Sequence, residues 1–124
     1  MNVLILYEDD VQDLVSFALK VKAQAGSEYS LKIRPVSEMA IAELLAAQVL
    51  LLGVKDLKSP HWHEFKRIME GINLAGRSAG YFLSKNSGDL VQMFAPTEIA
   101  MASKNFLTPD DVLVWLKSVK PFTA

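Results

Sequence analysis

The stretch that decides the fold is MNVLILYEDD, residues 1–10, in which an apolar run passes directly into three acids. Residues 3–7 show the unbroken apolar pattern of a parallel strand that is covered on both faces. In parallel α/β folds, ligands bind where a strand ends and the next helix begins. This first corner holds Glu8, Asp9 and Asp10 and no glycine, so its composition argues against a bound phosphate there.

The composition is that of an ordinary globular chain. Of 124 residues, 51% are hydrophobic and 22% are charged, so we expect residues 1–124 to form a single domain. The net charge of -1 gives no general attraction to nucleic acid or to anionic membranes, and we expect neither as a partner. The absence of cysteine excludes disulfides and thiol chemistry. No apolar run approaches the roughly 18 residues that span a bilayer, and no basic leader precedes the first strand, so we expect a cytoplasmic protein.

Apolar periodicity predicts alternating helices and strands along the rest of the chain. Residues 11–25 have helical spacing, residues 30–36 alternate as in a half-exposed edge strand, and residues 49–54 form the most apolar run, as in a central strand. The other predicted strands are residues 78–83 and 98–102, and the other predicted helices are residues 37–47, a segment that begins at Ser59 or Pro60, residues 89–94 and a last segment capped by Thr108. This alternation predicts a parallel sheet with helices on both faces.

Two further stretches carry a family resemblance. Residues 47–53, AQVLLLG, resemble the third strand of flavodoxins, where apolar residues lead into a glycine and a flavin-contacting loop. Residues 74–82, LAGRSAGYF, resemble the Leu-x-Gly-Lys lead-in to their fourth strand. The resemblance covers nearly the whole chain. It implies a flavodoxin-like three-layer αβα sandwich with a five-stranded parallel sheet of strand order 2-1-3-4-5.

The phosphate loop of that family has no counterpart in this sequence. Flavodoxins hold the FMN phosphate in a first loop of the type Thr/Ser-x-Thr-Gly-x-Thr, whose donors satisfy the phosphate oxygens. Residues 7–13 read YEDDVQD, with four carboxylates and no Gly, Ser or Thr. Each carboxylate would repel a phosphate by on the order of 1 kcal/mol in water, so FMN is not the expected cofactor. We favour a structural role for the acids, in which Asp9 or Asp10 caps the following helix and the others complement its dipole.

A weaker resemblance links the chain to response-regulator receiver domains, which share this fold. Receivers carry Mg²⁺-binding acids after their first strand and a Ser or Thr after their fourth, matched here by residues 8–10 and by Ser84. Gly53 stands where the phosphorylatable Asp should end the third strand, and the nearest carboxylate, Asp56, lies in the following loop. Phosphoryl transfer needs its acceptor in line, so the resemblance implies a receiver-like signalling domain without the usual acceptor. Whether the acids bind Mg²⁺ stays open.

Other candidate binding residues follow the third and fourth predicted strands. Trp62 stands where an aromatic could stack on a flavin, but we favour packing of its helix on the sheet. His61 and His63 are two residues apart and point away from each other, so no metal site is expected. Residues 84–88, SKNSG, suit a small anion ahead of a helix, although an ordinary loop capped by Ser87 is favoured. The candidate ligand edge comprises Glu8, Asp9, Asp10, Lys55, Trp62, Ser84, Lys85, Asn86, Ser87 and Gly88.

The sequence contains no complete catalytic constellation. With no cysteine and only two neighbouring histidines, a nucleophile and its base are hard to assemble, so we assign no catalytic residue. We expect a small soluble, non-enzymatic protein that acts through protein–protein contact or binds a small ligand other than FMN. An FMN-binding electron-transfer protein with an atypical phosphate site and a receiver-like domain are the alternatives. Neither the partner nor the oligomeric state follows from the sequence.

Overall fold

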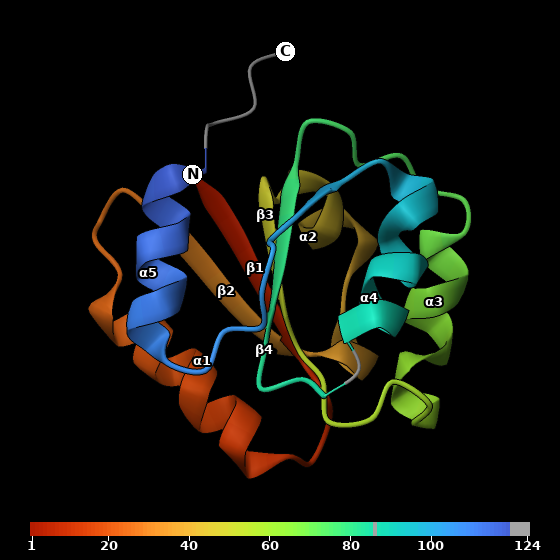
Figure 1. Cartoon of the computed structure of the whole chain (residues 1–124), viewed down its shortest axis with the longest axis horizontal. Coiled ribbons are helices and arrows are strands. Elements are labelled where there is room, and N and C mark those ends of the chain that lie inside the picture. Colours follow the sequence, from red (N-terminus) through yellow and green to blue (C-terminus); the bar gives the residue numbers. More distant parts are fainter. Residues whose placement is uncertain (86, 120–124) are drawn as a thin grey trace.

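The sheet at the centre of the molecule is parallel throughout. The computed structural model describes residues 1–85 and 87–119 (Figure 1). Its strands are β1 (Asn2–Tyr7), β2 (Ser30–Pro35), β3 (Val49–Gly53), β4 (Ser78–Phe82) and β5 (Ala100–Met101). They lie in the order β2-β1-β3-β4-β5, and every neighbouring pair is parallel. The expected strand order is therefore confirmed.

Helices cover both faces of this sheet (Figure 1). They are α1 (Gln12–Gln24), α2 (Ile41–Ala46), α3 (His63–Met69), α4 (Ser87–Phe94) and α5 (Pro109–Ser118), with short 3-10 helices η1 (Val36–Glu38), η2 (Pro60–Trp62) and η3 (Ala95–Thr97). Helices α1 and α5 pack side by side over one face, and α2, α3 and α4 cover the other. The last helix begins as expected, because Thr108 Oγ1 accepts a hydrogen bond of 3.2 Å from the backbone N–H of Asp111.

The two central strands divide their side chains between two hydrophobic cores. Successive residues of a strand point to opposite faces, so Val3 and Ile5 join the core beneath α1 and α5. Leu4 and Leu6 join the core beneath α2, α3 and α4. All residues of β3 are buried in the same way, which is why their sequence is apolar without alternation.

The helix predicted over residues 37–47 is confirmed only for Ile41–Ala46. This segment forms η1, then an extended link at Met39 and Ala40, and only then the short helix α2. The backbone N–H and hydroxyl of Ser37 both donate to the carboxylate of Asp9, which ties Ser37 to the corner after β1. Met39 and Ala40 then adopt an extended backbone, which separates η1 from α2.

The outer edge of β2 is protected against pairing with a further strand. The N–H of Ser30 donates to the carbonyl of Met1, so Ser30 faces the rest of the sheet. Successive residues of a strand direct their backbone N–H and C=O groups to opposite sides, so those of residues 31, 33 and 35 face the free edge of β2. Pro35 has no N–H to offer there, and Arg34 Nη1 donates to the carbonyl of Ile33 at 2.9 Å. The strand is half-exposed, as predicted, and its edge is blunted.

No helix within residues 1–85 and 87–119 combines the length and the apolar character needed to cross a membrane.

The predicted strand at residues 98–102 is shorter than expected, because it is confined to Ala100–Met101. Glu98, just before it, adopts a left-handed backbone conformation with φ 63.

Candidate functional site

The corner formed by β1 and β3 is the point at which the strand order reverses. β1 lies between β2 and β3, and in such sheets ligands bind outside the carboxyl ends of the strands at this point. Glu8 follows β1, and its backbone N–H donates to the carbonyl of Gly53 at the end of β3, at 2.9 Å. The acidic corner predicted from the sequence therefore lies at the switch point of the sheet.

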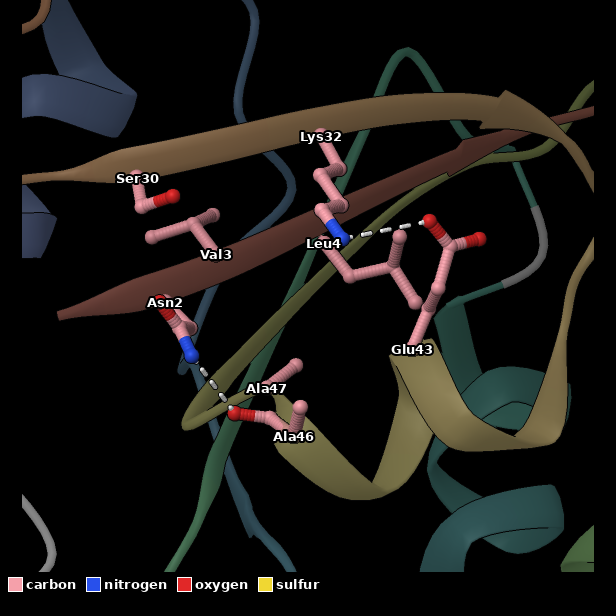
Figure 2. Close-up of a pocket in the computed structure, with 8 residues that line it drawn as sticks. All are labelled: Asn2, Val3, Leu4, Ser30, Lys32, Glu43, Ala46 and Ala47. Carbon is pink, nitrogen blue, oxygen red and sulfur yellow. Dashed lines mark hydrogen bonds and ion pairs between the residues drawn. The ribbon is translucent and has the colours of Figure 1, made fainter.

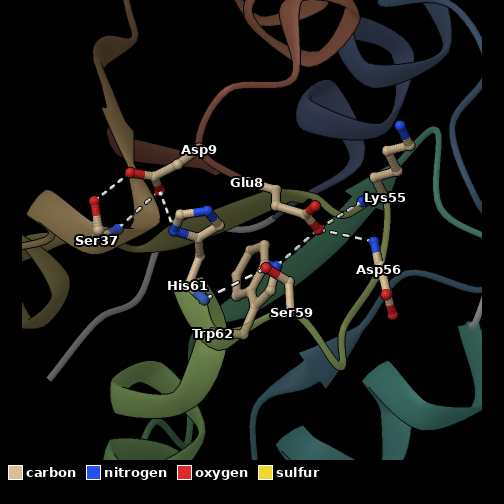
Figure 3. A network of polar contacts seen from close by, with 8 residues as sticks. All are labelled: Glu8, Asp9, Ser37, Lys55, Asp56, Ser59, His61 and Trp62. Atoms are coloured by element: carbon tan, nitrogen blue, oxygen red, sulfur yellow. Dashed lines mark hydrogen bonds and ion pairs between the residues drawn. The ribbon is translucent and has the colours of Figure 1, made fainter.

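The Glu8 side chain is turned inwards and bonded to three donors (Figure 3). Its Oε1 accepts from the backbone N–H groups of Lys55 and Asp56, at 3.1 and 2.8 Å, and from the indole Nε1 of Trp62, at 3.0 Å. Glu8 is only 6% exposed. A buried carboxylate is costly unless donors replace its water shell, and hydrogen bonds to a charged group are the strong ones. Glu8 therefore holds the segment after β3 against the end of β1.

Trp62 lies in the core beneath this segment rather than at the surface. It is 0% exposed, and its ring meets that of Phe65 edge to face, with centroids 5.7 Å apart. Buried indoles normally find a partner for their N–H, and here that partner is Glu8. The favoured packing role of Trp62 is confirmed, and its ring faces are covered by the protein.

Asp9 joins two other segments at the same corner (Figure 3). Its Oδ1 accepts from the backbone N–H of Ser37 at 3.2 Å, and its Oδ2 accepts from the Ser37 hydroxyl. His61 Nδ1 lies 4.0 Å from Asp9 Oδ1. Asp9 thus lies between η1 and η2 and contacts one residue of each.

The expected capping of α1 by Asp9 or Asp10 is wrong. The residue that precedes α1 is Val11, and no side chain caps this helix. Asp9 is engaged by Ser37, and Asp10 is exposed in a left-handed turn with φ 64. Asp tolerates this conformation better than most residues, which accounts for an acid at this position without a ligand.

The negative corner also acts on its neighbour Tyr7. Burial raises the pKa of the Tyr7 phenol above its ordinary value of 10.0, and the nearby carboxylates of Asp9, Glu38 and Asp10 raise it further. Both effects disfavour the phenolate. Their direction shows that the space around Tyr7 opposes additional negative charge.

The segment after β4 is only partly a loop. Ser84 is buried, its N–H donates to Asn105 Oδ1 at 3.0 Å, and its hydroxyl has no hydrogen-bond partner within the described residues. Lys85 is exposed. The prediction of a loop through Gly88 is wrong, because α4 already begins at Ser87. Asn86 lies outside the described residues.

The structure brings together one part of the predicted ligand edge. Glu8, Lys55 and Trp62 share one hydrogen-bonded cluster, and the Asp9 contacts lie beside it (Figure 3). The described residues of 84–88 take no part in this cluster. Among residues 1–85 and 87–119, no group of three or more His, Asp or Glu side chains is arranged to hold a metal ion.

Several hollows lie away from the acidic corner. A groove of about 450 Å³ runs between α3 and α4, with Leu57 and Met93 among its lining residues. A smaller one, of about 150 Å³, lies at the amino ends of β1 and β2 beside α2 (Figure 2). At its rim the carboxylate of Glu43 lies 3.6 Å from Lys32 Nζ and 3.0 Å from Arg34 Nη2.

Comparison with solved structures finds flavodoxins. A short-chain flavodoxin associated with a PDU bacterial microcompartment has a TM-score of 0.71 and 8% identity, over 96% of both chains. The flavodoxin of Streptococcus pneumoniae gives a TM-score of 0.69 and 12% identity, over 96% of this chain and 97% of that one. A mutant flavodoxin of Fusobacterium nucleatum bound to flavin mononucleotide gives 0.71 and 11%, also over 96% and 97%. At such identities the likeness shows the fold alone, and it confirms the expected flavodoxin-like architecture.

No protein-family model and no curated protein matches the chain.

Proposed function

We propose that this protein uses the flavodoxin-like fold without FMN, and that it acts through contact with a protein partner or by binding a different small ligand. The observation that carries the proposal is the inward-turned Glu8. Its carboxylate already takes up the N–H groups of Lys55 and Asp56, at the edge where this fold binds its ligands.

The residues present do not suit the FMN phosphate. Residues 7–13 carry four carboxylates and no Gly, Ser or Thr, so the corner between β1 and α1 offers a phosphate no hydroxyl from these residues and only repulsion from the carboxylates. Burial is the main cause of the raised pKa of Tyr7, and the carboxylates of Asp9, Glu38 and Asp10 raise it further, so the same negative charge contributes to this shift. These features support the loss of the phosphate loop.

The residues present also give a flavin ring little to stack on after β3. Trp62 is 0% exposed and its N–H is bonded to Glu8. A flavin could reach this indole only if the segment from Lys55 to Trp62 moved away from β1. Such a movement would break all three hydrogen bonds to Glu8.

The receiver-like alternative gains no support at its decisive position. A Cβ on Gly53 would lie 2.6 Å from ring atoms of Phe82, so the end of β3 has no room for an acceptor side chain. Asp56, the nearest carboxylate, is exposed and accepts from the N–H of Lys58 at 3.0 Å. The Asp56 side chain therefore stabilises the turn in which it lies.

The groove between α3 and α4 offers a place for a small ligand other than FMN. Its volume of about 450 Å³ falls within the range of about 300–1,000 Å³ that is usual for ligand sites. Apolar Leu57 and Met93 and charged Lys66 and Asp89 line it. A ligand there would carry both polar and apolar groups.

A fluorescence titration tests the proposal. Purified protein is added to FMN and, in parallel, to riboflavin, which lacks the phosphate. We expect no saturable quenching of either flavin. Quenching of FMN with micromolar affinity or tighter would contradict the proposal, and quenching of FMN but not of riboflavin would reveal a phosphate site that these residues do not suggest.

A further inference from the structure

We propose that the N–H groups of Lys55, Asp56 and Trp62 form a carboxylate-binding nest, which accepts an external acetate ion when residue 8 is shortened to alanine. In the native chain the occupant of this nest is Glu8 itself. The inference does not depend on the proposed function, because it concerns only the groups that face Glu8.

The donors have the arrangement of an anion site. Lys55 and Asp56 are consecutive, and their N–H groups point to one oxygen from 3.1 and 2.8 Å. Successive backbone N–H groups aimed at one point form a concavity that binds anions. The Trp62 indole adds a third donor at 3.0 Å from a different segment. All three are neutral groups, so hydrogen-bond geometry and shape select the occupant.

The nest has supports that do not involve Glu8. The turn after β3 is held by Asp56, whose carbonyl accepts from the N–H of Ser59 at 3.0 Å and whose Oδ1 accepts from the N–H of Lys58 at 3.0 Å. Trp62 is fixed in the core against Phe65. The donors are therefore expected to stay in place after Glu8 is shortened, with no acceptor of their own.

The size of the vacated space selects the ion. Replacing Glu8 by alanine removes one methylene and the carboxylate, which together have the size of acetate. Replacing it by glycine removes a further methylene and leaves room for propionate. An aspartate at this position keeps its carboxylate on a side chain one methylene too short, and leaves no room for either ion.

The experiment is chemical rescue of Glu8→Ala. Thermal unfolding is followed with increasing sodium acetate, with sodium chloride at equal ionic strength and with acetamide, the neutral analogue. We expect acetate alone to raise the Tm of Glu8→Ala saturably. At acetate concentrations ten times its dissociation constant, the folding equilibrium should shift about elevenfold towards the folded state. In the wild type and in Glu8→Gln the side chain of residue 8 itself occupies the nest. Both should therefore respond to acetate as they do to chloride.

Two further readouts locate the bound ion and its size preference. In a Trp115→Phe background, acetate should change the fluorescence of Trp62 in Glu8→Ala over the same concentration range that raises the Tm. Glu8→Gly should prefer propionate to acetate, and Glu8→Ala the reverse.

The outcomes are decisive even if Glu8→Ala does not fold alone. Folding that is restored by acetate and not by acetamide supports the nest. Equal responses to acetate, acetamide and chloride would overturn it, as would failure of Glu8→Ala and Glu8→Gly to fold at any concentration of either carboxylate.

Discussion

The indole Nε1 of Trp62 donates a 3.0 Å hydrogen bond to Oε1 of Glu8, across 54 positions of sequence. One partner is 0% exposed and the other 6%. The bond links the first corner of the sheet to the core beneath α3. An acid that stands where the fold would bind a ligand is thereby turned into a structural contact of the protein itself.

Replacing Glu8 by leucine tests this contact, because leucine fills a similar volume and accepts no hydrogen bond. The N–H groups of Lys55 and Asp56, which are partly buried, and the buried indole N–H of Trp62 would then lose their acceptor, at a cost of about 3 kcal/mol in the free energy of unfolding. Urea denaturation measures the loss. Asp10→Asn, at an exposed acid, is the control and should change stability by less than about 0.5 kcal/mol. Equal stability of Glu8→Leu and wild type would contradict the role of Glu8.

A double-mutant cycle isolates the bond itself. Trp62→Phe removes the indole N–H and keeps an aromatic ring, so its loss should overlap with that of Glu8→Leu. We expect a coupling energy of about 1 kcal/mol between the two changes, measured by chemical denaturation. The pair Trp115→Phe and Glu8→Leu should be additive within about 0.5 kcal/mol. Additivity of the first pair would show that the indole and the carboxylate do not interact.

The raised pKa of Tyr7 makes stability depend on alkaline pH. Unfolded chains ionise their tyrosines near the ordinary pKa of 10.0, whereas the folded state keeps Tyr7 protonated to higher pH. The contribution of Tyr7 is therefore fully present below pH 10 and is lost as the pH rises from 10 through the raised folded value. Absorbance titration should show a late-ionising phase whose amplitude Tyr7→Phe lowers by one tyrosine, and Asp9→Asn should shift the Tyr7 contribution towards 10. A late phase of unchanged amplitude in Tyr7→Phe would disprove the assignment.

Replacing two glycines by alanine should change the free energy of unfolding in opposite directions. A Cβ on Gly53 would lie 2.6 Å from the Phe82 ring, so Gly53→Ala should lower the free energy of unfolding by about 1–3 kcal/mol. Nothing lies within 4 Å of a Cβ at Gly88, inside α4, so Gly88→Ala should raise it by up to about 1 kcal/mol. Thermal unfolding compares the two, and a neutral Gly53→Ala would count against close packing at the end of β3.

The unpartnered hydroxyl of Ser84 gives a further prediction on stability. A buried polar atom without a hydrogen-bond partner is unfavourable, and Ser84 Oγ is such an atom among the described residues. Ser84→Ala should therefore leave stability unchanged or raise it by up to about 1 kcal/mol. A loss of stability in urea denaturation would indicate a hydrogen bond that these residues do not show.

The sequence predicted the sheet well because its signal is local and strong. The apolar residues of β1 and β3 are buried on both faces, and such strands stand out as unbroken apolar runs. The helix predicted over residues 37–47 begins later than expected, at Ile41, and Ser37 is instead bonded to Asp9, 28 positions earlier. A contact of that range leaves no mark on the local pattern.

The sequence correctly put the acidic corner at the end of β1. It predicted that these acids would cap the following helix, and they make other contacts instead. Consecutive acids at the start of a helix suggested caps, yet Glu8 is buried and bonded to donors 47, 48 and 54 positions away. The one available signal was Trp62, because a buried indole needs an acceptor. Sequence alone could not show that the nearest acceptor in space is Glu8.

The central claim is that Glu8 closes the switch point of the sheet against a flavin. The most direct measurement is an amide correlation NMR spectrum of nitrogen-labelled protein, with and without FMN. Because Glu8 engages the backbone N–H groups of Lys55 and Asp56 and the indole N–H of Trp62, we predict that these three resonances stay unmoved by FMN, and that Glu8→Gln shifts all three. FMN-dependent, saturable shifts of the same resonances in the wild type would contradict the account.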